Sequence, residues 1–266
     1  TYFFKGNYYY RFNDKMQKVD RGYPREIKKR WKNAPISFNS IFTYGYDSKN
    51  RKQVIYNPEY VKKQHEKKYK KILKLNKIFK NIIKDINKII DYNNYNDEYD
   101  IAIVIYMIIN CGFRIGNEKY KTANNSFGIT TLLYKHLNFY KNELTIDFIG
   151  KKGVRNVSKC LNNNIIKYLK NKKKSNYDDN KVFDITSYDV NIFLKKYNEK
   201  ITSKDLRTWN ANNLLIEYMK LPEIKTSRNP IKKGIEKVAT KLHNTYHICV
   251  KSYINPILIE KLKNKY

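Results

Sequence analysis

Cysteine is scarce in this sequence. The 266 residues contain three, Cys111, Cys160 and Cys249. Their number is odd, and their spacing is not that of metal ligands. A framework of disulfide bonds is therefore not expected, and this low cysteine content fits a protein of a reducing compartment.

Long hydrophobic runs are also missing. The longest apolar stretch, from Ile101 to Ile109, is much shorter than a helix that crosses a bilayer. No segment with a charged start and an apolar middle opens the chain, so a secretory signal peptide is not expected. We therefore expect a soluble, intracellular protein with no membrane partner.

Several familiar site patterns are absent as well. We find no P-loop glycine-lysine-serine pattern, no glycine-rich dinucleotide fingerprint and no cluster with metal-ligand spacing. The sequence thus predicts neither a nucleotide cofactor nor a metal.

Acidic residues are few beside basic ones. The chain has 24 Asp and Glu against 55 Lys and Arg, a formal net charge of +31. Such an excess attracts polyanions, and nucleic acid is the leading partner. An alternative is that AT-rich coding raised the lysine content everywhere. A membrane surface would also attract the charge, but no basic amphipathic anchor stands out. With 41% hydrophobic residues, the chain can still form a real core.

The first 36 residues differ from the rest by their aromatic strands and tight turns. Turn signals occur at Gly6-Asn7 and at Gly22-Tyr23-Pro24. The segment resembles a single hemopexin-type repeat. One such repeat cannot close a propeller, because repeats bury their faces against neighbours. The alternative is a β-rich piece whose aromatic side chains form a small core.

Residues 41–57 are predicted to form a hairpin with its turn around Ser48-Lys49-Asn50. With residues 1–36 it would make a β-rich N-terminal region, 1–57. Residues 58–266 would form the second domain. The alternative for the hairpin tip is a charged turn that is exposed to solvent and does not contact DNA.

Most of the second domain is predicted to be helical. Apolar residues at three- and four-residue steps predict one long amphipathic helix over residues 58–90 and a buried one over 100–109. Alternation over 144–149 predicts a strand, with 154–157 returning as its partner across a Gly-Lys-Lys-Gly turn. Further helices are expected over residues 164–171, 187–200, 204–219 and 231–242.

Four side chains in this domain are candidates for chemistry. Tyr253 is one of 25 tyrosines, and a phenol needs cationic neighbours to become a nucleophile. Arg114 follows the buried helix directly and would be costly to bury without an anion, although an ion pair with Glu118 is an alternative. Lys151 lies in the hairpin turn, where a lysine is usually only solvated. Arg207 lies on a predicted helix.

These residues stand in segments that together resemble the type IB DNA topoisomerases of poxviruses, giant viruses and bacteria. The resemblance covers residues from about 41 to 266, and the ordered motifs are far more specific together than any one alone. They are Tyr44 to Gln53, Cys111 to Glu118, Ser126 to Leu132, Phe148 to Gly153, Ser203 to Trp209, and Ala239 to Pro256. The N-terminal β-region is shorter here than is usual in that family.

The resemblance implies a fold and an activity. The fold class is α+β: a mainly helical catalytic domain of the type IB topoisomerase and tyrosine recombinase fold with a small sheet, preceded by a small β-rich piece. The implied activity is relaxation of supercoiled DNA through a transient 3′-phosphotyrosyl link, without ATP or metal. The expected partner is double-stranded DNA, and the protein is expected to act as a monomer at DNA, at a viral replication site or in the virion.

The resemblance also assigns roles. Tyr253 is the nucleophile, Lys151 the general acid, and Arg114, Arg207 and Asn244 stabilise the phosphate in the transition state. Asn244 stands where poxvirus enzymes have histidine, nine residues before the tyrosine. His243 and His247 flank that position, and surface or packing roles are the alternative for both. Contacts with DNA are expected from Lys49, Arg51, Lys52, Gln53, Tyr56 and Lys204.

Two competing functions remain open at this stage. A tyrosine recombinase shares the fold, but it normally has histidine three residues before the arginine that corresponds to Arg207. This chain has Lys204 there, as the topoisomerases do. The other alternative is a DNA-binding protein that has lost catalysis.

Overall fold

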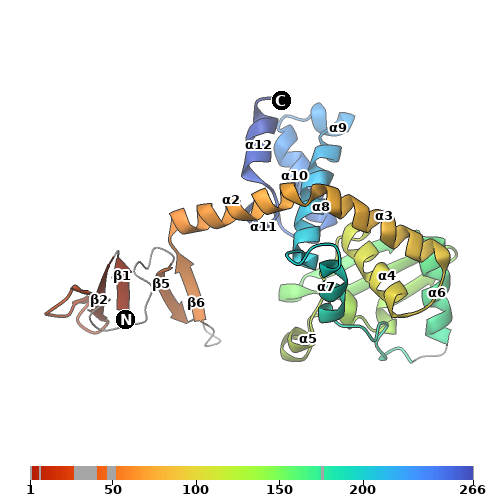
Figure 1. Cartoon of the computed structure of the whole chain (residues 1–266), viewed down its shortest axis with the longest axis horizontal. Coiled ribbons are helices and arrows are strands. Elements are labelled where there is room, and N and C mark those ends of the chain that lie inside the picture. The colour runs from red at the N-terminus through yellow and green to blue at the C-terminus, as the bar shows by residue number, and fades with distance from the viewer. Residues whose placement is uncertain (1, 6, 27–40, 47–51, 175–176, 266) are drawn as a thin grey trace. The chain divides into compact units, whose positions relative to one another are not determined.

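The structure is a computed structural model, and it describes residues 2–5, 7–26, 41–46, 52–174 and 177–265 (Figure 1). The chain divides into two compact units, Thr1–Lys71 and Ile72–Tyr266. The dividing point falls inside helix α2 (Pro58–Lys74), and each unit is described by itself below.

The N-terminal unit begins with a four-stranded antiparallel sheet. Its strands are β1 (Tyr2–Lys5), β2 (Tyr8–Asn13), β3 (Lys18–Val19) and β4 (Arg25–Glu26), and β2 pairs with the other three. Tyr9 is buried, and its ring contacts those of Tyr2 and Tyr23. This confirms a β-rich segment whose aromatic side chains pack together.

A second pair of strands follows in the same unit. Strands β5 (Ile41–Tyr46) and β6 (Lys52–Tyr56) are antiparallel, with Gly45 opposite Gln53. They confirm the two arms of the predicted hairpin. The turn predicted around residues 48–50 lies outside the described residues.

The C-terminal unit is mainly helical (Figure 1). Its α-helices beyond α2 are α3 (Asn76–Tyr92), α4 (Asp97–Asn110), α5 (Glu118–Asn124), α6 (Asn163–Lys174), α7 (Ser187–Lys195), α8 (Ser203–Tyr218), α9 (Pro222–Lys225), α10 (Pro230–Lys241), α11 (Tyr246–Ser252) and α12 (Pro256–Lys263). One antiparallel sheet runs in the order β7 (Leu137–Tyr140), β8 (Glu143–Ile149), β9 (Arg155–Cys160). The short 3₁₀ turns are η1 (Ile129–Thr131), η2 (Tyr134–His136) and η3 (Lys151–Gly153).

The prediction of a single helix over residues 58–90 is wrong, because the structure has two helices there. The structure interrupts it at Leu75, where φ is −88° and ψ is 3°, and so forms α2 and α3. Asn76 begins α3, and its side chain accepts a 2.7 Å hydrogen bond from the indole of Trp209. The apolar spacing continues through the break, so hydrophobic periodicity alone could not reveal it.

Two apolar cores fill the C-terminal unit. The larger one packs α3 and α4 against the β7–β9 sheet, α6, α7 and the start of α8. The smaller one joins the second half of α8 to the helices α9 to α12. Helix α8 therefore belongs to both, with Leu206 in the larger core and Leu215 in the smaller. Helices and small antiparallel sheets together confirm the α+β class.

No helix among the described residues combines the length and the apolar character that a membrane crossing demands.

Candidate active site

Arg207 lies at the junction of the two cores. It sits in the second turn of α8, whose start is fixed by reciprocal hydrogen bonds between Thr202 and Asp205. Its side chain is only 4% exposed. Burial of a guanidinium is costly unless its N–H groups find hydrogen-bond acceptors. Arg207 therefore has to be explained by what surrounds it.

The guanidinium of Arg207 is held by three acceptors. It donates to the carbonyl oxygens of Gly112 and Leu242, the latter at 2.5 Å. Its Nε lies 3.3 Å from the Tyr253 hydroxyl oxygen, and the guanidinium carbon Cζ lies 5.3 Å from the centre of the Tyr253 ring. One arginine thus joins three segments that are far apart in the sequence.

Gly112 allows this close approach. Its φ is +69°, and a Cβ at this position would collide with the carbonyl of Lys241. Only glycine fits both the backbone conformation and the space. The backbone after α4 can therefore meet the end of α10 and present the Gly112 carbonyl to Arg207.

Arg114 follows two residues later and is held through its backbone. Its carbonyl accepts a hydrogen bond from the N–H of Ile129 at 2.9 Å. Thr130 bonds the next carbonyl, that of Ile115, through both its N–H and its hydroxyl. The Ser126–Leu132 motif therefore supports the arginine segment.

The Arg114 side chain contacts Asn244. Its guanidinium donates to Asn244 Oδ1 at 2.5 Å, and the Asn244 amide donates to the carbonyl of Leu242 at 3.1 Å. Asn244 thus orients Arg114 while it is itself held by its own backbone. Two predicted site residues from opposite ends of the domain are brought together here.

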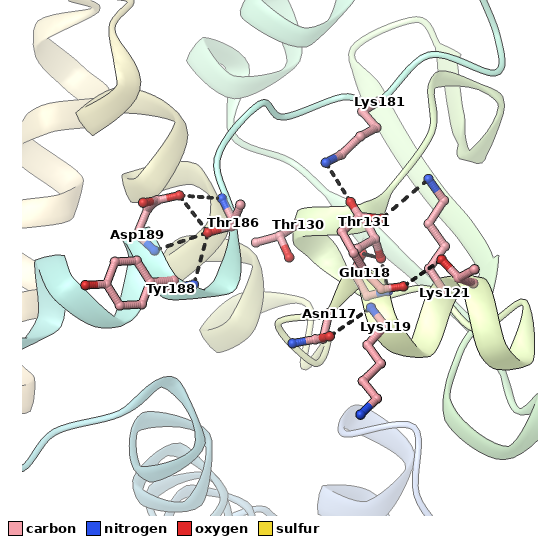
Figure 2. Close-up of polar contacts among 12 residues, drawn as sticks. Asn117, Glu118, Lys119, Lys121, Thr130, Thr131, Lys181, Thr186, Tyr188 and Asp189 are labelled. Atoms are coloured by element: carbon pink, nitrogen blue, oxygen red, sulfur yellow. Dashed lines mark hydrogen bonds and ion pairs between the residues drawn. The ribbon is translucent and has the colours of Figure 1, made fainter.

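Glu118 does not pair with Arg114 in the described structure, so that alternative is wrong. Its carboxylate lies 2.6 Å from the ammonium of Lys181 and 3.8 Å from that of Lys121 (Figure 2). Glu118 begins α5 and faces these lysines. The Arg114 guanidinium is therefore not neutralised by Glu118.

Tyr253 directly follows α11 as its C-cap residue, and its hydroxyl faces the arginines. Burial by itself would raise the pKa of the Tyr253 phenol. The charges of Arg207 and Arg114, with hydrogen bonds from both, outweigh that effect and lower the pKa below the usual value near 10. The site favours the phenolate.

The two histidines near this position differ. His247 lies on α11, exposed and in edge contact with Tyr246. His243 lies 3.0 Å from the Cys111 carbonyl through Nε2 and stacks on Phe113. Of the two, His243 contacts the segment that leads to Arg114.

Lys151 and Lys204 are both exposed and stand apart from this contact network. Lys151 opens η3, the turn between β8 and β9, as the sequence predicted. Among the described residues, no hydrogen bond or ion pair joins the Lys151 side chain to Arg114, Arg207 or Tyr253. Lys204 lies in the first turn of α8, one turn before Arg207.

The residues predicted to contact DNA from the hairpin belong to the N-terminal unit. Lys52 is exposed at the start of β6, Gln53 follows it, and Tyr56 stacks on Tyr60 with ring centres 5.7 Å apart. Lys49 and Arg51 lie outside the described residues.

Asn212 supports Tyr253 and was not among the predicted site residues. Its Nδ2 donates to the carbonyl of Tyr253 at 2.8 Å, and its Oδ1 accepts from the N–H of Asn255 at 2.8 Å. It therefore holds the backbone on both sides of Ile254. Asparagine is a poor helix former, so its presence inside α8 was the available signal.

Within the part of the chain that the structure describes, no group of three or more His, Cys, Asp or Glu residues is arranged to hold a metal ion. The charge at the site comes from arginine.

A family model matches most of the chain. It is described as eukaryotic DNA topoisomerase I, catalytic core, and it covers residues 49–265. The chain therefore belongs to the DNA topoisomerase I family. A second model, hemopexin, matches residues 1–35 and confirms the resemblance of the N-terminal segment.

Viral relatives agree with this assignment. The chain is 26% identical to DNA topoisomerase 1B of Acanthamoeba polyphaga mimivirus, over 97% of this chain and 84% of the relative. It is 25% identical to DNA topoisomerase 1B of Vaccinia virus (strain Copenhagen), over 83% and 72% respectively. The family match and these relatives confirm the predicted activity, that of a type IB DNA topoisomerase of viral kind.

Proposed function

We propose that Tyr253 is the nucleophile with which this topoisomerase cuts one DNA strand. The observation that carries the proposal is the contact of its hydroxyl with buried Arg207, beside Arg114 and Asn244. A cationic environment both favours the phenolate and receives the charge that develops on a phosphate.

The reaction is a pair of transesterifications. The Tyr253 oxygen attacks phosphorus, the bond from phosphorus to the 5′-oxygen breaks, and a 3′-phosphotyrosyl link forms. The tyrosine proton is lost, and the departing 5′-oxygen takes up a proton. After the free end has rotated, the 5′-hydroxyl attacks phosphorus and restores both the strand and the tyrosine. The bond energy stays in the link, so ATP is not consumed.

Arg114 and Arg207 would stabilise the non-bridging phosphate oxygens. Guanidinium is suited to this because its planar fork presents several donors to one phosphate. Arg207 has part of its fork engaged by backbone carbonyls, which fixes the direction of the rest. Asn244 would assist by orienting Arg114.

Lys151 would protonate the departing 5′-oxygen. Its turn lies in a hairpin whose strands are paired throughout, from Leu144 with Cys160 to Ile149 with Arg155. An exposed ammonium on a firmly paired hairpin is free to meet a DNA strand. This role follows from the register of the motif and from that exposure.

Further proposals concern the assembly around the site. The catalytic domain would have the fold of the tyrosine recombinases, and the β5–β6 hairpin would contact DNA through Lys52, Gln53 and Tyr56. Lys204 would contact a phosphate beside the cut. The protein would act as a monomer, at DNA inside the infected cell.

A supercoiled-plasmid assay tests the proposal. The protein should relax supercoils of both signs in EDTA, and DNA affinity should fall as salt rises, because binding releases counterions from the phosphates. Relaxation that required ATP or a divalent cation would contradict it.

The pH dependence of strand cleavage follows from the lowered pKa of Tyr253. Deprotonation creates the nucleophile, so the single-turnover rate should rise with pH and level off below the pH at which a free tyrosine ionises, about 10. Replacement of Arg114 by Met removes one of the charges that lower the pKa, and should shift the rise to higher pH. A rise centred at or above that of free tyrosine in the unaltered protein would argue against the phenolate.

A further inference from the structure

His243 adopts an unusual backbone conformation. Its φ is +50°, in the left-handed region that residues with a Cβ seldom enter. Glycine would fit this position without that cost. A histidine at this position directs attention to what its side chain contacts.

The imidazole of His243 is held on two sides. It stacks on the ring of Phe113, with centres 5.1 Å apart and planes at 17°. Its Nε2 lies 3.0 Å from the carbonyl oxygen of Cys111. Phe113 in turn packs edge-on against Phe148 of β8, so the stack is anchored in the larger core.

The stack relates two site residues to each other. Phe113 directly precedes Arg114, and His243 directly precedes Asn244. Arg114 and Asn244 are the pair that meet at 2.5 Å. The same two segments supply the carbonyls of Gly112 and Leu242, which hold Arg207. A shift of one segment against the other would therefore move both arginines.

We propose that His243 is a positioning residue for strand cleavage: by stacking on Phe113 and bonding the Cys111 carbonyl, it aligns Arg114 with Asn244. The inference rests on the proposed function of the site. It assigns to His243 neither contact with DNA nor transfer of a proton.

The neutral form of His243 suits this role. A carbonyl oxygen only accepts hydrogen bonds, so Nε2 carries the proton. Burial, then the neighbouring charges of Arg207, Arg114 and Lys241, outweigh the bond to Cys111 and lower the pKa of His243. A second proton would add a cation beside two arginines. Both effects favour the neutral imidazole.

Two variants separate alignment from folding. His243→Gly fits the left-handed backbone but removes the ring, and His243→Phe keeps the stack but loses the hydrogen bond. We expect the Gly variant to form the covalent adduct in single-turnover cleavage about 10- to 100-fold more slowly, because small displacements at a reacting centre have effects of this size. The Phe variant should fall between it and the unaltered protein.

DNA affinity should remain within about twofold in both variants, since phosphate contacts elsewhere dominate binding. The rate should keep the same shape against pH between about 6 and 8, where an unperturbed histidine titrates. His247→Ala is the matched control, because His247 is exposed on α11, and this variant should cleave normally.

Several results would overturn the inference. The first is an unchanged cleavage rate in His243→Gly. The second is a slower rate that returns to normal at a temperature where circular dichroism shows the variant fully folded. The third is a change of the cleavage rate with pH near neutrality that is present in the unaltered protein and absent from the variants without the imidazole. If the unaltered protein forms no covalent adduct, the proposed function itself fails, which is a separate outcome.

Discussion

Replacement of Tyr253 by phenylalanine is expected to abolish strand cleavage while leaving DNA binding intact. The change removes one oxygen from a partly exposed side chain, so the ring can keep its place against Arg207. Without that oxygen no phosphotyrosyl link can form. In a serine protease, loss of the nucleophile lowers the rate by on the order of 10⁶-fold. Plasmid relaxation and denaturing-gel detection of the covalent adduct measure the loss, and gel-shift titration measures binding.

Tyr246→Phe is the matched control, because Tyr246 is a half-buried tyrosine at the start of the same helix. It should relax DNA at close to the normal rate. Persistent adduct in the Tyr253 variant would remove Tyr253 as the nucleophile. In that case, peptide mapping of the adduct would identify which of the other tyrosines is linked to DNA.

Arg207→Lys is expected to have the second largest effect. Lysine keeps the positive charge but replaces a planar fork by a single ammonium. It cannot reach the carbonyls of Gly112 and Leu242 and the Tyr253 hydroxyl together, as the guanidinium does. We expect cleavage to slow by about 10²- to 10³-fold, the usual effect of losing one oriented donor in a transition state.

A stability change should accompany that loss of rate. The Gly112 carbonyl would lose its buried donor, which costs about 1–3 kcal/mol of unfolding free energy, whereas the Leu242 carbonyl would keep its hydrogen bond from Asn244. Denaturant unfolding measures this. Arg155→Lys is the control, since Arg155 of β9 is exposed, pairs with Asp147 of β8 and should tolerate the change. If Arg207→Lys cleaves normally, charge alone suffices and the fork geometry is irrelevant.

The elements of the catalytic domain were largely predictable. Helix α4 was evident from its wholly apolar run, because a fully buried helix has no polar face, and the β8–β9 hairpin was evident from its alternation. The break at Leu75 was not predictable. Its apolar spacing is continuous, and the bond from Trp209 to Asn76 comes from 133 residues away.

The candidate site, too, was predictable only in part. Tyr253 was selected among 25 tyrosines by the register of its motif, and Arg114 by the cost of burying a charge after an apolar helix. The contact of Arg114 with Asn244 and the support of Tyr253 by Asn212 had no local signature. The Glu118 alternative was plausible at four residues' distance, yet its carboxylate pairs with Lys181 from a distant segment and with Lys121 on the same helix.

The sequence by itself determined the class of protein, the order of its motifs, its large positive charge and the candidates for the reacting side chains. These follow from residue types and short spacings, which act locally. Only the tertiary structure decided that Arg207 is buried among three acceptors, that Asn244 orients Arg114, and that His243 stacks beside them. The physical reason is that hydrogen bonds and ring contacts depend on distances of a few ångströms between segments. Those distances are set when the two cores pack on either side of α8, and no local pattern encodes them.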